Sequence, residues 1–229
     1  MEYTLVMTAA VDVKGMTGIS AESVIGREDQ YINTLKFYVM KKCVTDILFI
    51  DNSGWDLTRI KSAVASNKVT YLSFDENDYP RKWGKGYGEM LIMDHAVDFL
   101  RKKYGERMIV KVTGRFPVLN IDKMVREFSR RKNLVYSIDI IEHGLYRMLG
   151  LNWAASKSRT IIYAISTGFY MGNVYGRYRQ IPSVYGGAEG LMRAVWDETR
   201  NQPGVYSRFK TEPRLSGVGG GEELCVAYS

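Results

Sequence analysis

Short apolar runs alternate along the chain with longer segments of helical spacing. Ile47-Leu48-Phe49-Ile50 is an uninterrupted apolar run that stops at Asp51-Asn52-Ser53-Gly54, as buried parallel strands commonly do. An earlier apolar run covers Thr4 to Ala10, and Glu28 to Lys42 carries apolar side chains at helical spacing between the two. The pattern therefore predicts a strand–helix–strand unit at the start of the chain.

The alternation continues as far as residue 131. The next predicted elements are a helix at Leu57 to Ser66, a strand at Val69 to Phe74, a helix at Glu89 to Tyr104, a strand at Arg107 to Val112 and a helix at Ile121 to Arg131. Beyond them the pattern weakens and predicts strands at Val135 to Ile141 and Thr160 to Ile165, and a helix at Ala188 to Thr199. This order favours an α/β fold with a mainly parallel, Rossmann-like sheet flanked by helices.

Length and composition fit a single domain of this kind. The chain has 229 residues, of which 45% are hydrophobic, enough for a large core. We expect residues 1–118 to form a nucleotide-binding half and residues 119–229 an acceptor-binding half on the same sheet. The net charge of +7 suits an anionic partner, whether a nucleotide, a phospholipid surface or nucleic acid.

Cysteine content and the absence of long apolar runs bear on where the protein works. Cys43 and Cys225 are the only cysteines and lack metal-ligand spacing, so neither a disulfide framework nor a zinc site is expected. The chain shows no basic, apolar leader, and no apolar run approaches the about 20 residues of a membrane span. The sequence thus predicts a cytoplasmic protein.

Polar residues that follow a strand, or that precede a helix, are candidates for ligand binding. Asp51 and Ser53 follow a predicted strand, where open α/β sheets bind ligands; an ordinary Asx turn is the alternative. Gly84-Lys85-Gly86-Tyr87-Gly88 precedes a predicted helix, where backbone amides favour an anion and Lys85 supplies a cation. The segment matches neither the dinucleotide fingerprint nor the P-loop, so a purely structural turn is its alternative.

Three further groups suggest chemistry. Lys111 and Arg115 lie at the end of the fourth predicted strand, from which they could reach a diphosphate, with an internal ion pair as the alternative. Glu189 begins the last predicted helix and is a candidate general base, or simply a carboxylate stabilised by the helix dipole. Aromatic and basic residues alternate from Phe169 to Tyr185, indicating a sugar or single-stranded nucleic-acid surface, or a structural tyrosine layer.

Several short motifs resemble the GT-A type nucleotide-sugar glycosyltransferases, and in particular the small bacterial members of capsule and O-antigen synthesis. They lie at Asp46 to Asp56, Gly84 to Glu89, Lys111 to Phe116 and Glu212 to Gly220. The resemblance implies a GT-A-like fold. It also implies that the base and ribose of the donor are held by Ala9, Asp12, Asp51 and Ser53, and that the diphosphate faces Lys85, Lys111 and Arg115.

The chain departs from that family at one position. GT-A enzymes commonly carry Asp-x-Asp at the end of the fourth strand, where this chain has Lys111-Val112-Thr113. Without paired carboxylates a divalent cation loses its oxygen ligands. We therefore expect metal-independent binding and no cofactor beyond the nucleotide-diphosphate sugar, which is the donor substrate. A metal held by Asp12 or Asp139 is the alternative.

The predicted activity is transfer of a sugar from a nucleotide-diphosphate donor to a saccharide hydroxyl, with Glu189 as the base. The expected acceptor is a saccharide on a lipid-linked precursor of a bacterial surface polysaccharide, reached by peripheral contact with the anionic inner membrane face. A nucleotidyltransferase, or another nucleotide-binding α/β enzyme, is the first alternative. A noncatalytic nucleic-acid-binding module is the second, but the chain has no recognisable nucleic-acid motif, so no nucleic-acid partner is expected.

Overall fold

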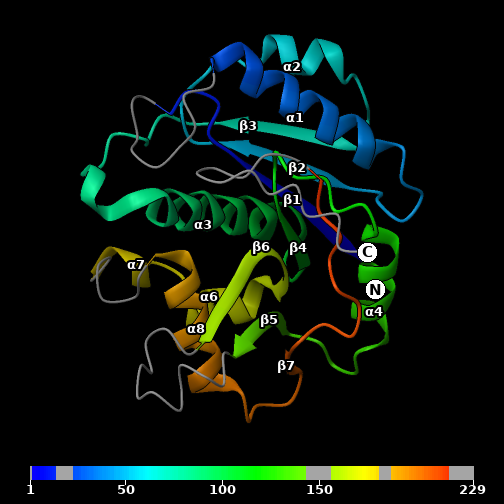
Figure 1. The fold of residues 1–229 in the computed structure, drawn as a ribbon, viewed down its shortest axis with the longest axis vertical. Helices are drawn as coiled ribbons and strands as arrows, with labels where there is room; N and C mark the ends of the chain where they lie inside the picture. The colour runs from blue at the N-terminus through cyan, green and yellow to red at the C-terminus, as the bar shows by residue number, and fades with distance from the viewer. Residues whose placement is uncertain (1, 14–22, 143–155, 181–186, 217–229) are drawn as a thin grey trace.

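A computed structural model describes residues 2–13, 23–142, 156–180 and 187–216. One sheet of seven strands runs through these residues in the order β3-β2-β1-β4-β6-β5-β7 (Figure 1). Its strands are β1 (Tyr3–Ala9), β2 (Ile47–Asp51), β3 (Val69–Ser73), β4 (Met108–Thr113), β5 (Tyr136–Glu142), β6 (Ser156–Ser166) and β7 (Val205–Ser207). Neighbouring strands are parallel except β6, which is antiparallel to both β4 and β5. The predicted single-domain α/β fold with a mainly parallel sheet is confirmed.

Helices cover both faces of the sheet (Figure 1). They are α1 (Val24–Val39), α2 (Thr58–Ala63), α3 (Gly84–Tyr104), α4 (Ile121–Arg130), α6 (Thr167–Asn173), α7 (Arg177–Gln180) and α8 (Ala188–Thr199), with a 3-10 turn, η1, at Arg81–Trp83. Helices α1 and α2 lie on one side, while α3 and α6 to α8 lie on the other. None of the helices in the described ranges has the length and apolar character that a bilayer span requires.

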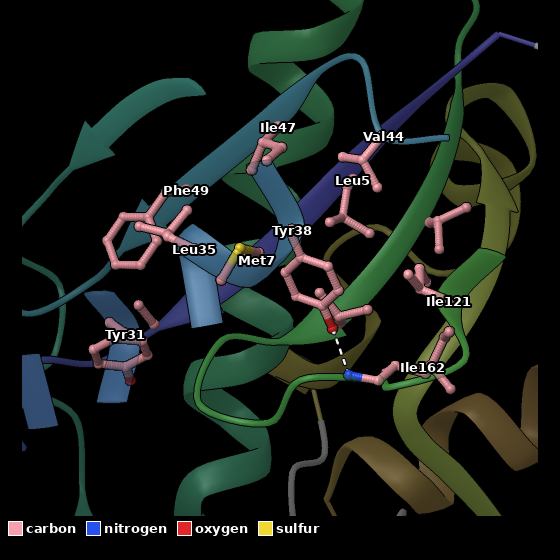
Figure 2. Close-up of a cluster of buried hydrophobic side chains, with 14 of the residues drawn as sticks. Leu5, Met7, Tyr31, Leu35, Tyr38, Val44, Ile47, Phe49, Ile121 and Ile162 are labelled. Carbon is pink, nitrogen blue, oxygen red and sulfur yellow. Dashed lines mark hydrogen bonds between the residues drawn. The ribbon is translucent and has the colours of Figure 1, made fainter. Parts of the chain in front are cut away.

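Each face of the sheet has its own hydrophobic core. Successive side chains of a strand point to opposite faces, so Leu5 and Met7 pack beneath α1 whereas Val6 packs against α3 and α8. Figure 2 shows the first core, where the Tyr38 hydroxyl accepts a hydrogen bond from the Val118 amide at 2.9 Å. Burial on both faces explains why the strands appear as unbroken apolar runs in the sequence.

The glycine-rich segment is not the loop that the sequence predicts. Helix α3 begins at Gly84 instead of Glu89, so these glycines form its first turns. A Cβ atom at Gly86 would lie 2.4 Å from the Ala188 backbone nitrogen, and one at Gly88 would lie 2.4 Å from the Tyr79 hydroxyl oxygen. Close packing, and not turning of the chain, therefore explains these two glycines.

The aromatic segment that begins at Phe169 forms part of the second core. Phe169, Tyr170 and Tyr178 are buried, and Tyr175 donates a hydrogen bond to Asp98 at 2.7 Å. The arginines of this segment form ion pairs: Arg177 with Glu198, and Arg179 with Asp94. Its described part is thus a structural tyrosine layer, which was one of the three interpretations of the sequence; Tyr185 lies outside the described residues.

Candidate functional site

The carboxyl ends of β1 to β4 meet at one edge of the sheet, because these strands are parallel. The register pairs Ala9 with Asp51, and the Asp12 amide donates a hydrogen bond to Ser53 Oγ at 3.1 Å. The four residues predicted to hold the base and ribose therefore lie together. Open α/β sheets bind ligands at such an edge.

Asp51 organises this part of the edge. Its carboxylate is fully buried and accepts hydrogen bonds from the Val11 amide at 2.8 Å, from the amide and hydroxyl of Ser53 at 3.0 and 2.9 Å, and from Ser73 Oγ at 3.1 Å. Burial raises the pKa of the Asp51 carboxyl, and these donors oppose the shift. Asp51 thereby fixes the segment after β1 against the segments after β2 and β3.

Arg27 is a second organiser of the edge, and the sequence analysis did not identify it. Its side chain is buried and donates from Nη2 to the Ala10 carbonyl at 2.6 Å and from Nε to the Val11 carbonyl at 3.1 Å. Its Nη1 is also buried and finds no hydrogen-bond partner among the described residues. The signal that could have identified it is a charged residue on the side of a helix that faces the sheet. The predicted helix began at Glu28, so Arg27 lay outside it.

Lys111 forms an internal ion pair, as one interpretation of the sequence held. Its side chain is 0% exposed, and Nζ donates to Glu89 Oε1 at 2.5 Å, to the Thr160 carbonyl at 2.6 Å and to Thr113 Oγ1 at 3.2 Å. The sequence assigned no role to Glu89. In the structure its carboxylate, which is 22% exposed, is the solvent-accessible member of this pair.

The other two predicted cations are more accessible. Lys85 is exposed in the first turn of α3. Arg115 is partly exposed just after β4, and its Nη1 donates to Gln30 Oε1 at 3.1 Å. Both cations belong to elements that meet at the carboxyl edge of the sheet, so positive charge is available there for an anionic ligand.

Glu189 lies where the N-terminal ends of α3 and α8 pack together. Gly86 contacts Ala188 closely, and the Glu189 carbonyl accepts a hydrogen bond from Ser158 Oγ. The Glu189 residue is exposed, but partial desolvation by the surrounding protein raises the pKa of its carboxyl group. The negative charge of Glu89 raises this pKa further, whereas the positive charges of Lys85 and Lys111 lower it. We call the group of Lys85, Glu89, Lys111 and Glu189 the α3–α8 junction.

The end of β4 does not fit a divalent cation, because Lys111, Val112 and Thr113 offer no carboxylate there. Within the described ranges, no three His, Cys, Asp or Glu side chains are grouped to hold a metal ion. Asp139, one of the two alternative metal ligands, is paired with Arg159 at 3.3 Å. Asp12, the other, lies at the carboxyl edge beside Ser53.

No protein-family model matches the chain, and no curated protein matches its sequence. Solved structures do share its fold. A 4-diphosphocytidyl-2C-methyl-D-erythritol synthase from Anaerococcus prevotii DSM 20548 is 12% identical with a TM-score of 0.51, over 90% of this chain and 86% of that chain. A cytidylyltransferase from Leptospira borgpetersenii serovar Hardjo-bovis (strain JB197) is 11% identical with a TM-score of 0.51, over 92% and 76%.

A third similar structure, core-mannan synthase A from Aspergillus fumigatus in its Mn/GDP form, is 9% identical over 86% of this chain and 69% of that chain. Its TM-score is 0.46, and nothing is inferred from it. At identities this low the likeness to the first two structures concerns the fold alone. Together with the sheet order, it establishes the GT-A-like α/β fold for this chain.

Proposed function

We propose that this protein is a glycosyltransferase that moves a sugar from a nucleotide-diphosphate donor to a saccharide hydroxyl. The supporting observation is the α3–α8 junction, where the close packing of Gly86 against Ala188 brings together the two helix ends that carry Lys85 and Glu189. Transfer to a hydroxyl needs a base for the acceptor proton and positive charge for the departing diphosphate. The junction offers both beside a sheet edge that suits a nucleotide.

The donor occupies the carboxyl edge in this proposal. Ala9, Asp12 and Ser53 lie at the part of the edge that takes the base and ribose. Asp51, which is fully buried, positions them through its hydrogen bonds. Lys85 and Arg115 face the diphosphate. The proposal assigns Lys111 an indirect role through Glu89, because its ammonium group is fully buried. These donor residues all belong to residues 1–118, whereas Glu189 belongs to residues 119–229, the proposed acceptor half.

The reaction is a displacement at the anomeric carbon. Glu189 takes the hydroxyl proton of the acceptor, and the acceptor oxygen forms a bond to the anomeric carbon. The bond from that carbon to the diphosphate breaks, and its electron pair leaves with the nucleoside diphosphate. Lys85, Arg115 and the N-terminal amides of α3 stabilise the departing charge in the role that a metal ion has in other enzymes.

The proposed setting is synthesis of a bacterial surface polysaccharide such as capsule or O-antigen, in the cytoplasm. The acceptor is a saccharide, free or lipid-linked, and the net charge of +7 supports peripheral contact with an anionic membrane face. This part of the proposal rests on the motif resemblance at Asp46 to Asp56 and Lys111 to Phe116.

A nucleotidyltransferase is the second candidate, because the two structures with a TM-score of 0.51 are a diphosphocytidyl-compound synthase and a cytidylyltransferase. The nucleophile in nucleotidyl transfer to a phosphate is largely ionised near neutral pH and needs no base. Glu189 would then have no proton to accept. A carboxylate at the junction therefore favours a neutral hydroxyl acceptor.

Isothermal titration calorimetry tests the proposal directly. The protein is titrated in chelator, and again with a divalent metal, using nucleoside diphosphates, their sugar conjugates and nucleoside triphosphates. We expect one nucleoside diphosphate and its sugar conjugate to bind in chelator. Loss of a hydrogen bond to a charged group costs about 1.5–3 kcal/mol, so Lys85→Ala and Arg115→Ala should each weaken binding at least about tenfold.

Lys102→Ala is the matched control, since it removes a cation from the opposite end of α3 and should leave the affinity unchanged. Binding of triphosphates only, with metal, together with release of pyrophosphate from the triphosphate when a sugar phosphate is added, would establish the nucleotidyltransferase instead. Absence of binding under both conditions would contradict the proposal.

A further inference from the structure

Lys111 is a charged side chain in the interior of the sheet. An unpaired buried ammonium group is very costly, so such a residue needs an ionised partner and an acceptor for each donor. Lys111 has these in Glu89, Thr160 and Thr113. Glu89 is thus the counterion that the buried Lys111 ammonium group requires.

Neighbouring positions of β6 bring the Lys111–Glu89 ion pair close to Glu189. The Thr160 carbonyl accepts from Lys111, and Ser158 Oγ, two residues earlier on the same strand, donates to the Glu189 carbonyl. On the helix side, Gly86 contacts Ala188, and Glu89 follows Gly86 by three residues, which places it on the same helix face. Two independent contacts thus hold the two glutamates at one junction.

We propose that Glu89, the counterion of Lys111, is a positioning residue that makes Glu189 the proton acceptor of the site. A fixed negative charge disfavours ionisation of a second carboxylate beside it, which makes that second group the better base. This inference rests on the proposed function for the source of the proton, the acceptor hydroxyl. The coupling between the two glutamates does not depend on any substrate.

Among the described residues, the charges that act on Glu189 come from α3 and β4. Helix α3 provides Glu89 and Lys85, and β4 provides Lys111. The effect of Glu89, which raises the pKa of Glu189, exceeds the opposing effect of either lysine. Removal of the Glu89 charge should therefore lower the pKa of Glu189 although both cations remain.

One proton moves in the proposed step. It passes from the acceptor hydroxyl to a carboxylate oxygen of Glu189, and the ion pair between Glu89 and Lys111 takes no part in the transfer. When the product has left, Glu189 returns the proton to solvent, to which it is exposed. The Lys111–Glu89 pair is thus unchanged at the end of each turnover.

A carbon-13 NMR titration of the glutamate carboxyl groups in the whole protein tests the coupling without any ligand. The Glu189 signal is assigned by its loss in Glu189→Gln. We expect its titration midpoint to shift to lower pH in Glu89→Gln, and to stay near the wild-type midpoint in Glu89→Asp, which keeps the charge. Asp98→Asn removes a carboxylate from the later turns of α3, away from the junction. This variant should leave the midpoint unchanged.

If Glu89→Gln fails to fold because Lys111 loses its counterion, the double variant Lys111→Met/Glu89→Gln removes both buried charges. Its Glu189 midpoint should also shift to lower pH, because the effect of Glu89 exceeds that of Lys111. An unchanged Glu189 midpoint in the folded variant would overturn the inference. A shifted midpoint combined with no nucleotide binding in calorimetry would sustain the coupling and reject the proposed function.

Activity separates positioning from a purely structural role. With a donor found by calorimetry, Glu89→Gln should move the acid limb of the kcat/KM profile to lower pH and leave the donor KM unchanged. Glu189→Gln should lower kcat about 10²- to 10⁴-fold, the usual contribution of a general base. A proportional loss at every pH in Glu89→Gln would indicate a structural residue and contradict the inference.

Discussion

At the scale of single residues, the buried polar side chains distinguish this protein from an ordinary α/β core. Asp51, Arg27 and Lys111 are each buried and each hold segments that are far apart in the sequence. A buried polar group costs stability unless its hydrogen bonds are made. These residues therefore limit the edge of the sheet to one arrangement, whatever ligand binds there.

Asp94 leads to a prediction about pH. Its carboxylate is 1% exposed and accepts hydrogen bonds from Tyr170 and Gly176, and burial raises its pKa to about 6. The pKa of an unperturbed aspartate in the unfolded state is 3.8. Between this pH and about 6, the folded state therefore holds a proton that the unfolded state has released. The contribution of Asp94 to the free energy of unfolding is present at about pH 4 and is lost as the pH rises through about 6.

We expect Asp94→Asn to remove this dependence. A shift of about two pKa units corresponds to about 3 kcal/mol, so the difference in unfolding free energy between about pH 4 and pH 8 should shrink by up to that amount. Urea unfolding at both pH values measures it. Asp197→Asn, at an exposed ion pair with Arg193, is the control, and an identical pH dependence in wild type and Asp94→Asn would refute the assignment.

At the scale of elements, α3 connects the two halves of the candidate site. Its first two turns carry Lys85 and Glu89 and pack against α8 through Gly86, while its later turns cover one face of β1 and β2. The sequence predicted either an anion-binding loop or a purely structural turn for these glycines. In the structure they allow two helix ends to approach, because glycine has no Cβ atom to separate them.

Gly86→Ala tests this packing role. Although alanine favours helices by about 1 kcal/mol over glycine, its Cβ would lie 2.4 Å from the Ala188 nitrogen. We expect a net loss of about 1–3 kcal/mol in the free energy of unfolding, as for other overpacked sites. Thermal and urea unfolding measure the change.

Gly172→Ala is the matched control, because Gly172 is also helical and a Cβ there meets nothing within 4 Å. That variant should be neutral or stabilised by up to about 1 kcal/mol. Equal stability of the Gly86 and Gly172 variants would show that the contact between α3 and α8 is not close.

At the scale of the whole molecule, the described segment that follows β7, residues 208–216, packs against residues from the middle of the sequence. After β7 it runs beside the β4–α4 connection, where the Leu119 amide donates to the Arg214 carbonyl at 2.7 Å and the Ser216 amide to the Pro117 carbonyl at 3.2 Å. Asn120 adds two side-chain bonds, to the Glu212 carbonyl and from the Arg214 amide, both at 2.8 Å. These hydrogen bonds hold the segment against the β4–α4 connection.

Asn120→Ala should release this segment without unfolding the sheet. Loss of two neutral hydrogen bonds, each about 1 kcal/mol, should raise the rate of proteolytic cleavage within residues 209–216 roughly tenfold or more and leave the melting temperature nearly unchanged. Limited proteolysis with mass spectrometry locates the cut. The control Asn173→Ala loses only a bond within α6, and equal cleavage of the two variants would contradict the prediction.

The elements of the first half could be predicted because their signal is local. Apolar periodicity gave β1 to β4, α1, α2 and α4 within a few residues, and α8 with the observed bounds. The short elements α6, α7 and β7 were missed, since a few residues hold too little periodicity and depend on tertiary packing. The antiparallel direction of β6 was not predicted either, because strand direction depends on the connections and not on the strand itself.

The sequence by itself determined that Ala9, Asp12, Asp51 and Ser53 gather at one edge, because parallel strands place their carboxyl ends together. Only the tertiary structure decided the partners of Lys111 and Arg27, and the contact between Gly86 and Ala188. Helical and strand patterns reflect neighbours a few residues apart, whereas Lys111 and Glu89 meet across 22 residues of chain. Such a pair exists only after the sheet and both helix layers have packed.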